Sequence, residues 1–179
     1  MDADWEVEIG GGAPVIEANW QGFIDLRANP ERVGEICEAA SFPPLTALLL
    51  GLNGAHSPVW TAKCDLWEPE EAAGSSSLAC YVDLLPVEGM VFAEWQQAEE
   101  FCRDFVKRLA QAGPSDCSVE LVIRQAIAGA TEGFAITAYI SAAGTDRAAA
   151  ATALTAALAD FVDALPPSMP PRTAASKLQ

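Results

Sequence analysis

Polar and apolar residues alternate along six segments of the chain, and this period of two is typical of β-strands that bury one face. The segments form three consecutive pairs, each joined by a short link of glycine, serine or acidic residues. Such links connect antiparallel neighbours, because a parallel crossover needs about a dozen residues or more. The pattern therefore predicts three antiparallel hairpins, with strands at 4–9 and 15–26, at 59–67 and 77–85, and at 119–127 and 132–142.

The same pattern predicts the register of all three hairpins, since a slip of one residue would turn apolar side chains toward the polar face. In the first hairpin, it places Trp5, Val7 and Ile9 opposite Trp20, Ala18 and Ile16, and it turns Glu6 and Glu8 to the other face. In the second hairpin, the best separation of the two faces pairs Cys64 with Cys80 and turns Trp60 toward the apolar side. In the third hairpin, it pairs Val119 with Ile140. We therefore expect a sheet with one apolar face.

Each predicted hairpin is followed by a helical pattern, in which apolar residues recur every three or four positions. The first helical region begins at Asn29-Pro30 and is interrupted at Pro43-Pro44. The second spans 92–112, and the third runs from 145 to 165. The order strand, strand, helix thus occurs three times.

The second strand of each hairpin contains a similar tetrapeptide, at a constant spacing of 58 residues (23 to 81 and 81 to 139). The tetrapeptides are Phe23 to Leu26, Tyr81 to Leu84 and Tyr139 to Ala142. An internal repeat and a chance alignment of amphipathic strands both explain this spacing. The predicted order of elements, ββα-ββα-ββα, does not depend on which explanation holds.

These elements predict an α+β fold of two layers, in which a mostly antiparallel sheet of about six strands carries its helices on one face. A chain of 179 residues is long enough for one core of this kind. We expect a single domain over 1–165. The proline-rich segment 166–179 is predicted to be a disordered C-terminal tail.

Charge narrows the classes of function. The chain has 10 basic and 25 acidic residues and a net charge of −15, which disfavours binding to nucleic acid or to an anionic membrane surface. The N-terminus lacks the pattern of a signal peptide, and the longest apolar stretch, 45–52, is far shorter than the roughly 20 residues of a membrane helix. We expect a cytoplasmic protein, and the use of alanine and of arginine over lysine indicates a bacterial source.

The titratable residues give no catalytic motif. The five cysteines have neither disulfide-framework nor zinc-site spacing, so no metal and no cofactor are expected. Cys64 and Cys80 fit a redox pair, or two buried, reduced and unreactive thiols, and the apolar surroundings favour the second interpretation. His56, the only histidine, lies in a turn-like loop and is interpreted as a solvated residue.

The opposite face of the predicted sheet holds the candidate site. It carries more aromatic residues than a solvated sheet face usually does, set among charged ones. Asp25, Asp83 and Lys63 could perform acid–base chemistry there, or could form an ordinary solvated surface with an ion pair. The candidate binding residues are Phe23, Asp25, Lys63, Trp67, Tyr81, Asp83 and Tyr139.

These features favour a non-enzymatic protein-binding module, such as an adaptor or an inhibitor, whose acidic surface steers a basic protein partner. The alternative is a small-molecule-binding protein or enzyme that uses Asp25, Asp83 and Lys63. A third hypothesis is a structural subunit of a larger assembly. A concave pocket with convergent polar groups would favour the enzyme, and a flat aromatic patch would favour the binding module. We also expect a homodimer through the same face, which tightens as salt screens its carboxylates.

Overall fold

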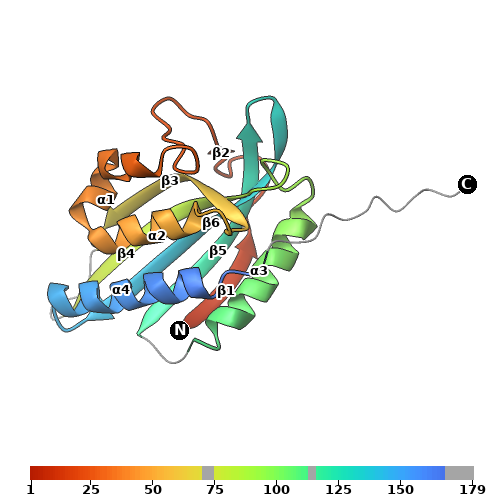
Figure 1. Cartoon of the computed structure of the whole chain (residues 1–179). Helices are drawn as coiled ribbons and strands as arrows, with labels where there is room; N and C mark the ends of the chain where they lie inside the picture. Colours follow the sequence, from red (N-terminus) through yellow and green to blue (C-terminus); the bar gives the residue numbers. More distant parts are fainter. Residues whose placement is uncertain (70–74, 113–115, 168–179) are drawn as a thin grey trace, which may run out of the picture.

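The computed structural model describes residues 1–69, 75–112 and 116–167, which form an α+β fold around one six-stranded sheet (Figure 1). Helices α2, α3 and α4 pack on one face of that sheet, as the apolar pattern predicts. In chain order the elements are β1 (Asp2–Val7), β2 (Ile16–Glu17), the 3-10 helix η1 (Pro30–Glu35), α1 (Cys37–Ser41), α2 (Pro43–Leu52), β3 (Val59–Trp67), β4 (Ser76–Pro86), α3 (Trp95–Leu109), β5 (Cys117–Ala128), β6 (Thr131–Gly144) and α4 (Arg147–Asp163).

The strand order is β1-β5-β6-β4-β3, and the sheet is mixed. The second and third predicted hairpins, β3–β4 and β5–β6, are antiparallel. The first predicted hairpin is wrong, because β1 and β2 do not pair with each other. Both run parallel to β5 and together form one interrupted edge strand beside it. Turns and coil over residues 8–15, which include the glycine-rich link 10–12, connect the two parts, and the chain continues in the same direction.

The segment that follows β2 is not a strand. Residues 18–29 form turns and coil, so the strand predicted as far as residue 26 ends at Glu17. The tetrapeptides that begin at Tyr81 and Tyr139 do lie in neighbouring strands, whereas the one that begins at Phe23 lies in coil. The 58-residue spacing therefore does not correspond to three equivalent strands. After this coil, η1, α1 and α2 replace the first helical region, and Pro43 opens α2, where a proline is readily accommodated.

The register of β5 and β6 is confirmed, with Val119 opposite Ile140. In β3 and β4, Cys64 lies opposite Val82, so its predicted pairing with Cys80 is wrong by two residues. This even shift keeps both cysteines on the helix-covered face, where they are diagonal neighbours. Cys80 is buried and Cys64 is half-buried, and burial raises the pKa of each thiol to about 12. All five cysteines are free, and rapid labelling of either Cys64 or Cys80 in the folded protein is not expected.

A β-bulge in β3 changes which face some side chains occupy. The register shifts between Thr61 and Cys64, and this extra residue turns Trp60 and Ala62 to the face opposite the helices. The prediction that Trp60 lies on the apolar face with Cys64 is therefore wrong. Strict alternation cannot reveal a bulge, because Trp60 and Ala62 are apolar and both faces of the sheet are apolar at this end.

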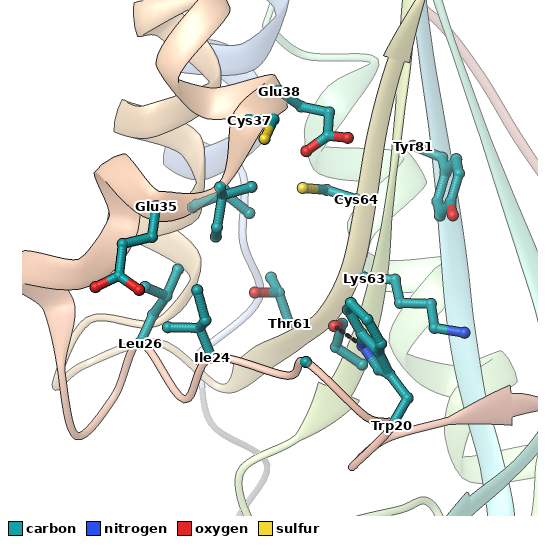
Figure 2. A pocket seen from close by; sticks show the side chains of 14 residues that line it. Trp20, Ile24, Leu26, Glu35, Cys37, Glu38, Thr61, Lys63, Cys64 and Tyr81 are labelled. Carbon is teal, nitrogen blue, oxygen red and sulfur yellow. Dashed lines mark hydrogen bonds between the residues drawn. The ribbon is translucent and has the colours of Figure 1, made fainter.

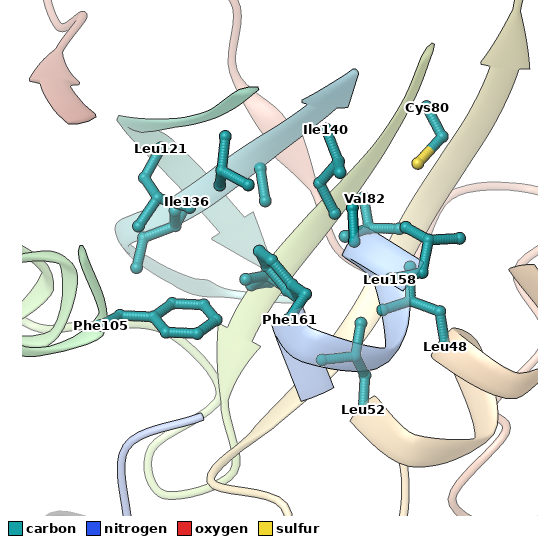
Figure 3. Close-up of a cluster of buried hydrophobic side chains, with 14 of the residues drawn as sticks. Leu48, Leu52, Cys80, Val82, Phe105, Leu121, Ile136, Ile140, Leu158 and Phe161 are labelled. Atoms are coloured by element: carbon teal, nitrogen blue, oxygen red, sulfur yellow. The ribbon is translucent and has the colours of Figure 1, made fainter. Parts of the chain in front are cut away.

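The main core lies between the sheet and the helices (Figure 3). The rings of Phe105 on α3 and Phe161 on α4 meet with their centroids 4.6 Å apart, which ties the two helices together over the sheet. Leu48 and Leu52 extend the same core beneath α2, and Val82 contributes from the interior strand β4.

A second apolar cluster covers one end of the opposite face. It is centred on Trp60, which is completely buried, and on Leu85 of β4. Phe23 packs against Trp60 at a centroid distance of 5.8 Å, so the coil after β2 closes over this end of the sheet. The remaining part of this face is open and is called the outer face. It carries Asp65, Trp67, Tyr81, Glu120 and Tyr139.

Substitution of Gly144 by alanine is expected to lower the free energy of unfolding by about 1–3 kcal/mol. A Cβ atom at Gly144 would overlap the backbone nitrogen of Ala150 and lie 2.8 Å from the carbonyl carbon of Ala149, in the first turn of α4. Gly34→Ala is the matched control, since a Cβ atom there meets nothing within 4 Å. Urea unfolding of both variants tests this, and equal stabilities would contradict the close packing of α4 on β6.

Within the three described ranges, no helix combines the length and the apolar character that crossing a membrane requires. The predicted C-terminal tail begins at Pro166 and, from residue 168 onward, lies outside the described residues. The prediction that it is disordered stays a prediction.

Candidate functional site

The outer face carries a row of side chains that crosses the whole sheet, here called the tyrosine row. Tyr81 of β4 and Tyr139 of β6 are direct cross-strand neighbours at its centre. Asp65 of β3 lies opposite Tyr81, and Glu120 of β5 lies opposite Tyr139. Asp4 of β1 lies beyond Glu120. The strand pairing therefore places two aromatic rings between carboxylates on either side.

Trp67 joins the two tyrosines to form an aromatic cluster. Its ring centroid lies 6.3 Å from that of Tyr81 and 6.5 Å from that of Tyr139, and the two tyrosine rings are 5.9 Å apart. Trp67 is 37% exposed, and both tyrosines are half-buried. Burial, followed by the nearby carboxylates of Asp83 and Asp65, raises the pKa of Tyr81 to about 12. Its hydroxyl therefore keeps its proton, and it has no hydrogen-bond partner among the described residues.

A hydrogen-bonded polar chain crosses the sheet beside the tyrosine row. Arg124 of β5 donates two bonds to one carboxylate oxygen of Glu8, at 2.9 and 2.7 Å. It also donates to the hydroxyl oxygens of Thr137, at 3.1 Å, and Tyr139, at 3.0 Å. The Thr137 hydroxyl in turn donates to Asp83 at 2.7 Å. These contacts fix the Tyr139 ring, which also lies beneath the Arg124 guanidinium with 5.5 Å between its carbon and the ring centroid.

Asp83 is the most deeply buried charged residue of this chain of contacts, with 5% of its surface exposed. Burial raises the pKa of its carboxyl group, although the Thr137 hydrogen bond and the positive charges of Lys63 and Arg124 oppose this shift. Lys63, in the bulge of β3, extends over the ring of Trp20, with its Nζ 5.4 Å from the ring centroid. Asp83 is thus buried in the sheet and is not accessible to a substrate.

Replacement of Asp83 by asparagine is expected to raise the free energy of unfolding at pH 7 by about 1 kcal/mol, because it removes a buried charge. The raised pKa means that the folded state holds this proton to higher pH than the unfolded state does. The contribution of Asp83 to stability therefore falls as pH rises from the ordinary value of 3.8 through the folded pKa.

The stability difference between Asp83→Asn and the wild type should accordingly shrink as pH is lowered toward 4. Urea unfolding across a pH series measures it. Asp65→Asn, an exposed carboxylate in the neighbouring strand, is the control and should give no such trend. A difference for Asp83→Asn that grows on acidification would contradict the burial argument.

The structure brings five of the sequence-predicted site residues together and excludes two. Lys63, Trp67, Tyr81, Asp83 and Tyr139 share the outer face. The other two, in the coil after β2, lie elsewhere.

Phe23 packs against Trp60, and Asp25 forms an ion pair with Arg27 at 3.0 Å, which lowers the pKa of the aspartate. The two residues do not join the outer face because their segment never pairs with the sheet. The acid–base set of Asp25, Asp83 and Lys63 is therefore not assembled.

Sequence reasoning missed the polar chain among the site residues. Parity along β5 and β6 placed Arg124 and Thr137 on the correct face, and this was a usable signal. Parity also placed Glu8 on this face, but its contact with Arg124 could not be predicted, because it depends on the parallel pairing of β1 with β5, which lies more than a hundred residues away in the sequence.

A pocket of 440 Å³ adjoins the site at the edge strand β3 (Figure 2). It lies between this strand and the segment 20–38, and it shares Lys63 and Tyr81 with the outer face. We call it the β3 pocket. Among the described residues, no three Cys, His, Asp or Glu side chains are grouped so that they could hold a metal ion, and His56 is exposed in the loop before β3.

The fold and site thus define an acidic α+β protein with one helix-covered and one partly open sheet face. No protein-family model, curated protein or solved structure matches the chain.

Proposed function

We propose that the protein is a non-enzymatic protein-binding module whose outer face receives a basic protein partner. The observation that carries this proposal is the tyrosine row, in which a half-exposed aromatic pair lies between carboxylates contributed by three other strands. An arginine or lysine side chain of a partner would pack on these rings and meet the carboxylates at their sides.

The charges around the aromatic cluster favour a cationic partner. Asp4, Asp65 and Glu120 are exposed and form no ion pair within the described part of the chain. Two basic residues, Lys63 and Arg124, lie beside the tyrosine row, and Arg124 is already paired with Glu8 at 2.7 Å. The negative field of the face would increase the association rate with a basic protein, and this field acts in addition to the net charge of −15.

The geometry gives less support to catalysis on this face. Asp83 is buried, Tyr81 keeps its proton, and Asp25 lies outside the site. The face offers a packed aromatic cluster and exposed carboxylates, which suit recognition rather than proton transfer.

Self-association uses the same face but has the opposite dependence on salt. In a homodimer, Asp65 and Glu120 would approach other carboxylates, so added salt would tighten it. A complex with a basic partner would instead weaken with salt. Sedimentation of the purified protein across a salt series distinguishes the two, and a dimer that tightens with salt would favour self-association.

The proposal is tested by affinity capture from the source organism with three matched baits. These are the wild type, Trp67→Ala on the outer face, and Leu50→Ser, an exposed apolar residue of α2 on the helical layer. We expect a basic protein that the wild type and Leu50→Ser retain, that Trp67→Ala loses, and that salt releases. Capture of the same proteins by all three baits, or of none by the wild type, would overturn the proposal.

A further inference from the structure

The β3 pocket has the dimensions of a small-molecule site. Its 440 Å³ lie within the range of about 300–1,000 Å³ that is typical of such sites. One wall is β3, with Thr61 and Cys64, and the opposite wall is the coil before η1 together with the start of α1 (Figure 2). The pocket is therefore built by segments that are far apart in the sequence.

Apolar side chains form most of the pocket lining. Ile24 and Leu26 come from the coil, Ile36 from the start of α1, and Leu49 from α2. The indole of Trp20 also lines the pocket and is held in place, since its Nε1 donates to the backbone oxygen of Ala62 at 3.0 Å. A ligand with an apolar body would find a fixed surface there.

One charge inside the pocket lacks a partner. The Glu38 carboxylate forms no hydrogen bond or ion pair with any described residue, whereas Glu35 is paired with Arg32 through bonds of 2.9 and 2.8 Å. Figure 2 shows the Glu38 carboxylate and the Cys64 sulfur pointing toward one another. Burial, then the charge of Glu38, raises the pKa of Cys64 to about 12, so this thiol is neutral.

The one lysine that lines the pocket does not neutralise Glu38. Figure 2 shows Lys63 extending to the other side of β3, toward Tyr81 and away from Ile24. Its charge acts on Asp83, in the sheet, and its Nζ lies over Trp20. The end of the pocket that holds Glu38 therefore combines apolar walls with one unpaired negative charge, whereas the positive charge of Lys63 lies over Trp20.

We infer that the β3 pocket binds a small organic amine, in which an ammonium group is carried by an aliphatic or aromatic body. The ammonium group meets Glu38, and the body packs against Ile24 and Leu26, on the side of the pocket away from Lys63. A carboxylate of the same shape would be repelled by Glu38, and a neutral analogue would leave that charge unpaired. This inference is independent of the proposed function, because Glu38 and the apolar lining do not belong to the outer face.

The test uses three probes of matched shape: phenethylamine, 2-phenylethanol and 3-phenylpropanoate. Each is titrated into the isotope-labelled protein, and amide chemical shifts are followed. We expect saturable one-to-one binding of the amine with shifts at residues 24–26, 36–38 and 61–64. Its affinity should exceed that of the alcohol about tenfold, the effect of one charge-assisted hydrogen bond, and the carboxylate should not bind.

Glu38→Gln should lower the affinity for phenethylamine about tenfold, to that of the alcohol. Glu100→Gln, an exposed carboxylate on α3, is the matched control and should leave it unchanged. Urea unfolding establishes that both variants are folded.

Three results would overturn the inference. They are equal binding of the three probes, no saturable binding of the amine, and amine binding that Trp67→Ala abolishes while Glu38→Gln does not. The last result would assign the amine to the outer face and would leave the proposed function standing.

Discussion

Replacement of Trp60 by alanine is expected to lower the free energy of unfolding by about 3–5 kcal/mol, the cost of emptying a large buried site. Trp60 is completely buried, and its ring contacts Phe23 and the Arg27 guanidinium, whose carbon is 4.2 Å from the ring centroid. Its Nε1 donates to the backbone oxygen of Pro86 at 3.0 Å, and that oxygen would lose its donor. The coil that closes this end of the sheet would lose its principal support.

Trp67→Ala is the matched control, because it removes the same side chain from the same strand. Trp67 is 37% exposed, so the expected loss of stability is less than about 1 kcal/mol. Urea unfolding followed by circular dichroism measures both variants. Similar losses at Trp60 and Trp67 would mean that the bulge of β3 does not divide the strand into a structural and an exposed part.

The same Trp67→Ala variant is expected to weaken binding of the captured basic partner by about 30-fold or more, or about 2 kcal/mol. Trp67 contacts both tyrosine rings and is the most exposed member of the aromatic cluster. Its removal would therefore delete contact area with the partner and leave the Tyr81 ring with one aromatic neighbour, Tyr139, in place of two. Leu50→Ser, on the helical layer, should change the affinity less than twofold.

Isothermal titration calorimetry of the wild type and both variants tests this expectation. Asp65→Lys should act differently, reducing the association rate and the salt dependence, since it reverses a charge at the rim of the cluster. An unchanged affinity for Trp67→Ala would remove the aromatic cluster from the interface.

Much of the sheet could be predicted from the chain because its central part alternates regularly. The pairing of Val119 with Ile140 followed from parity, and it places Tyr139 beside Glu120. The same parity placed Tyr81 and Asp83 on the face opposite the helices. Where alternation is uninterrupted and the connection is short, local pattern and native register agree.

The features of the fold that the sequence does not predict depend on contacts between distant segments, which a local pattern does not encode. The edge formed by β1 and β2 lies beside β5 because of pairing across more than a hundred residues, and a glycine-rich link resembles a hairpin turn until that partner is known. The bulge between Thr61 and Cys64 reverses parity within one strand, so Trp60 was assigned to the wrong face. Phe23 and Asp25 lie outside the outer face for a related reason, since their segment forms coil and does not pair with the sheet.

The β3 pocket could not be predicted from the sequence. The pocket lies between β3 and the coil and helices of residues 20–38, where the sequence pattern predicts the end of a strand and a continuous helix. Glu38 has no distinguishing sequence signal, because an acidic residue in a helical pattern is usually a solvated one. Its lack of a partner becomes apparent only when Glu35 is seen paired with Arg32.

We propose that the outer face, through its tyrosine row, binds a basic partner. The most direct measurement is amide chemical-shift mapping of the isotope-labelled protein in complex with the captured partner. We expect the largest shifts at residues 65–67, 79–83, 118–122 and 137–141, and we expect them to diminish as salt is raised. Shifts concentrated on α2 and α4, or unaffected by salt, would contradict it.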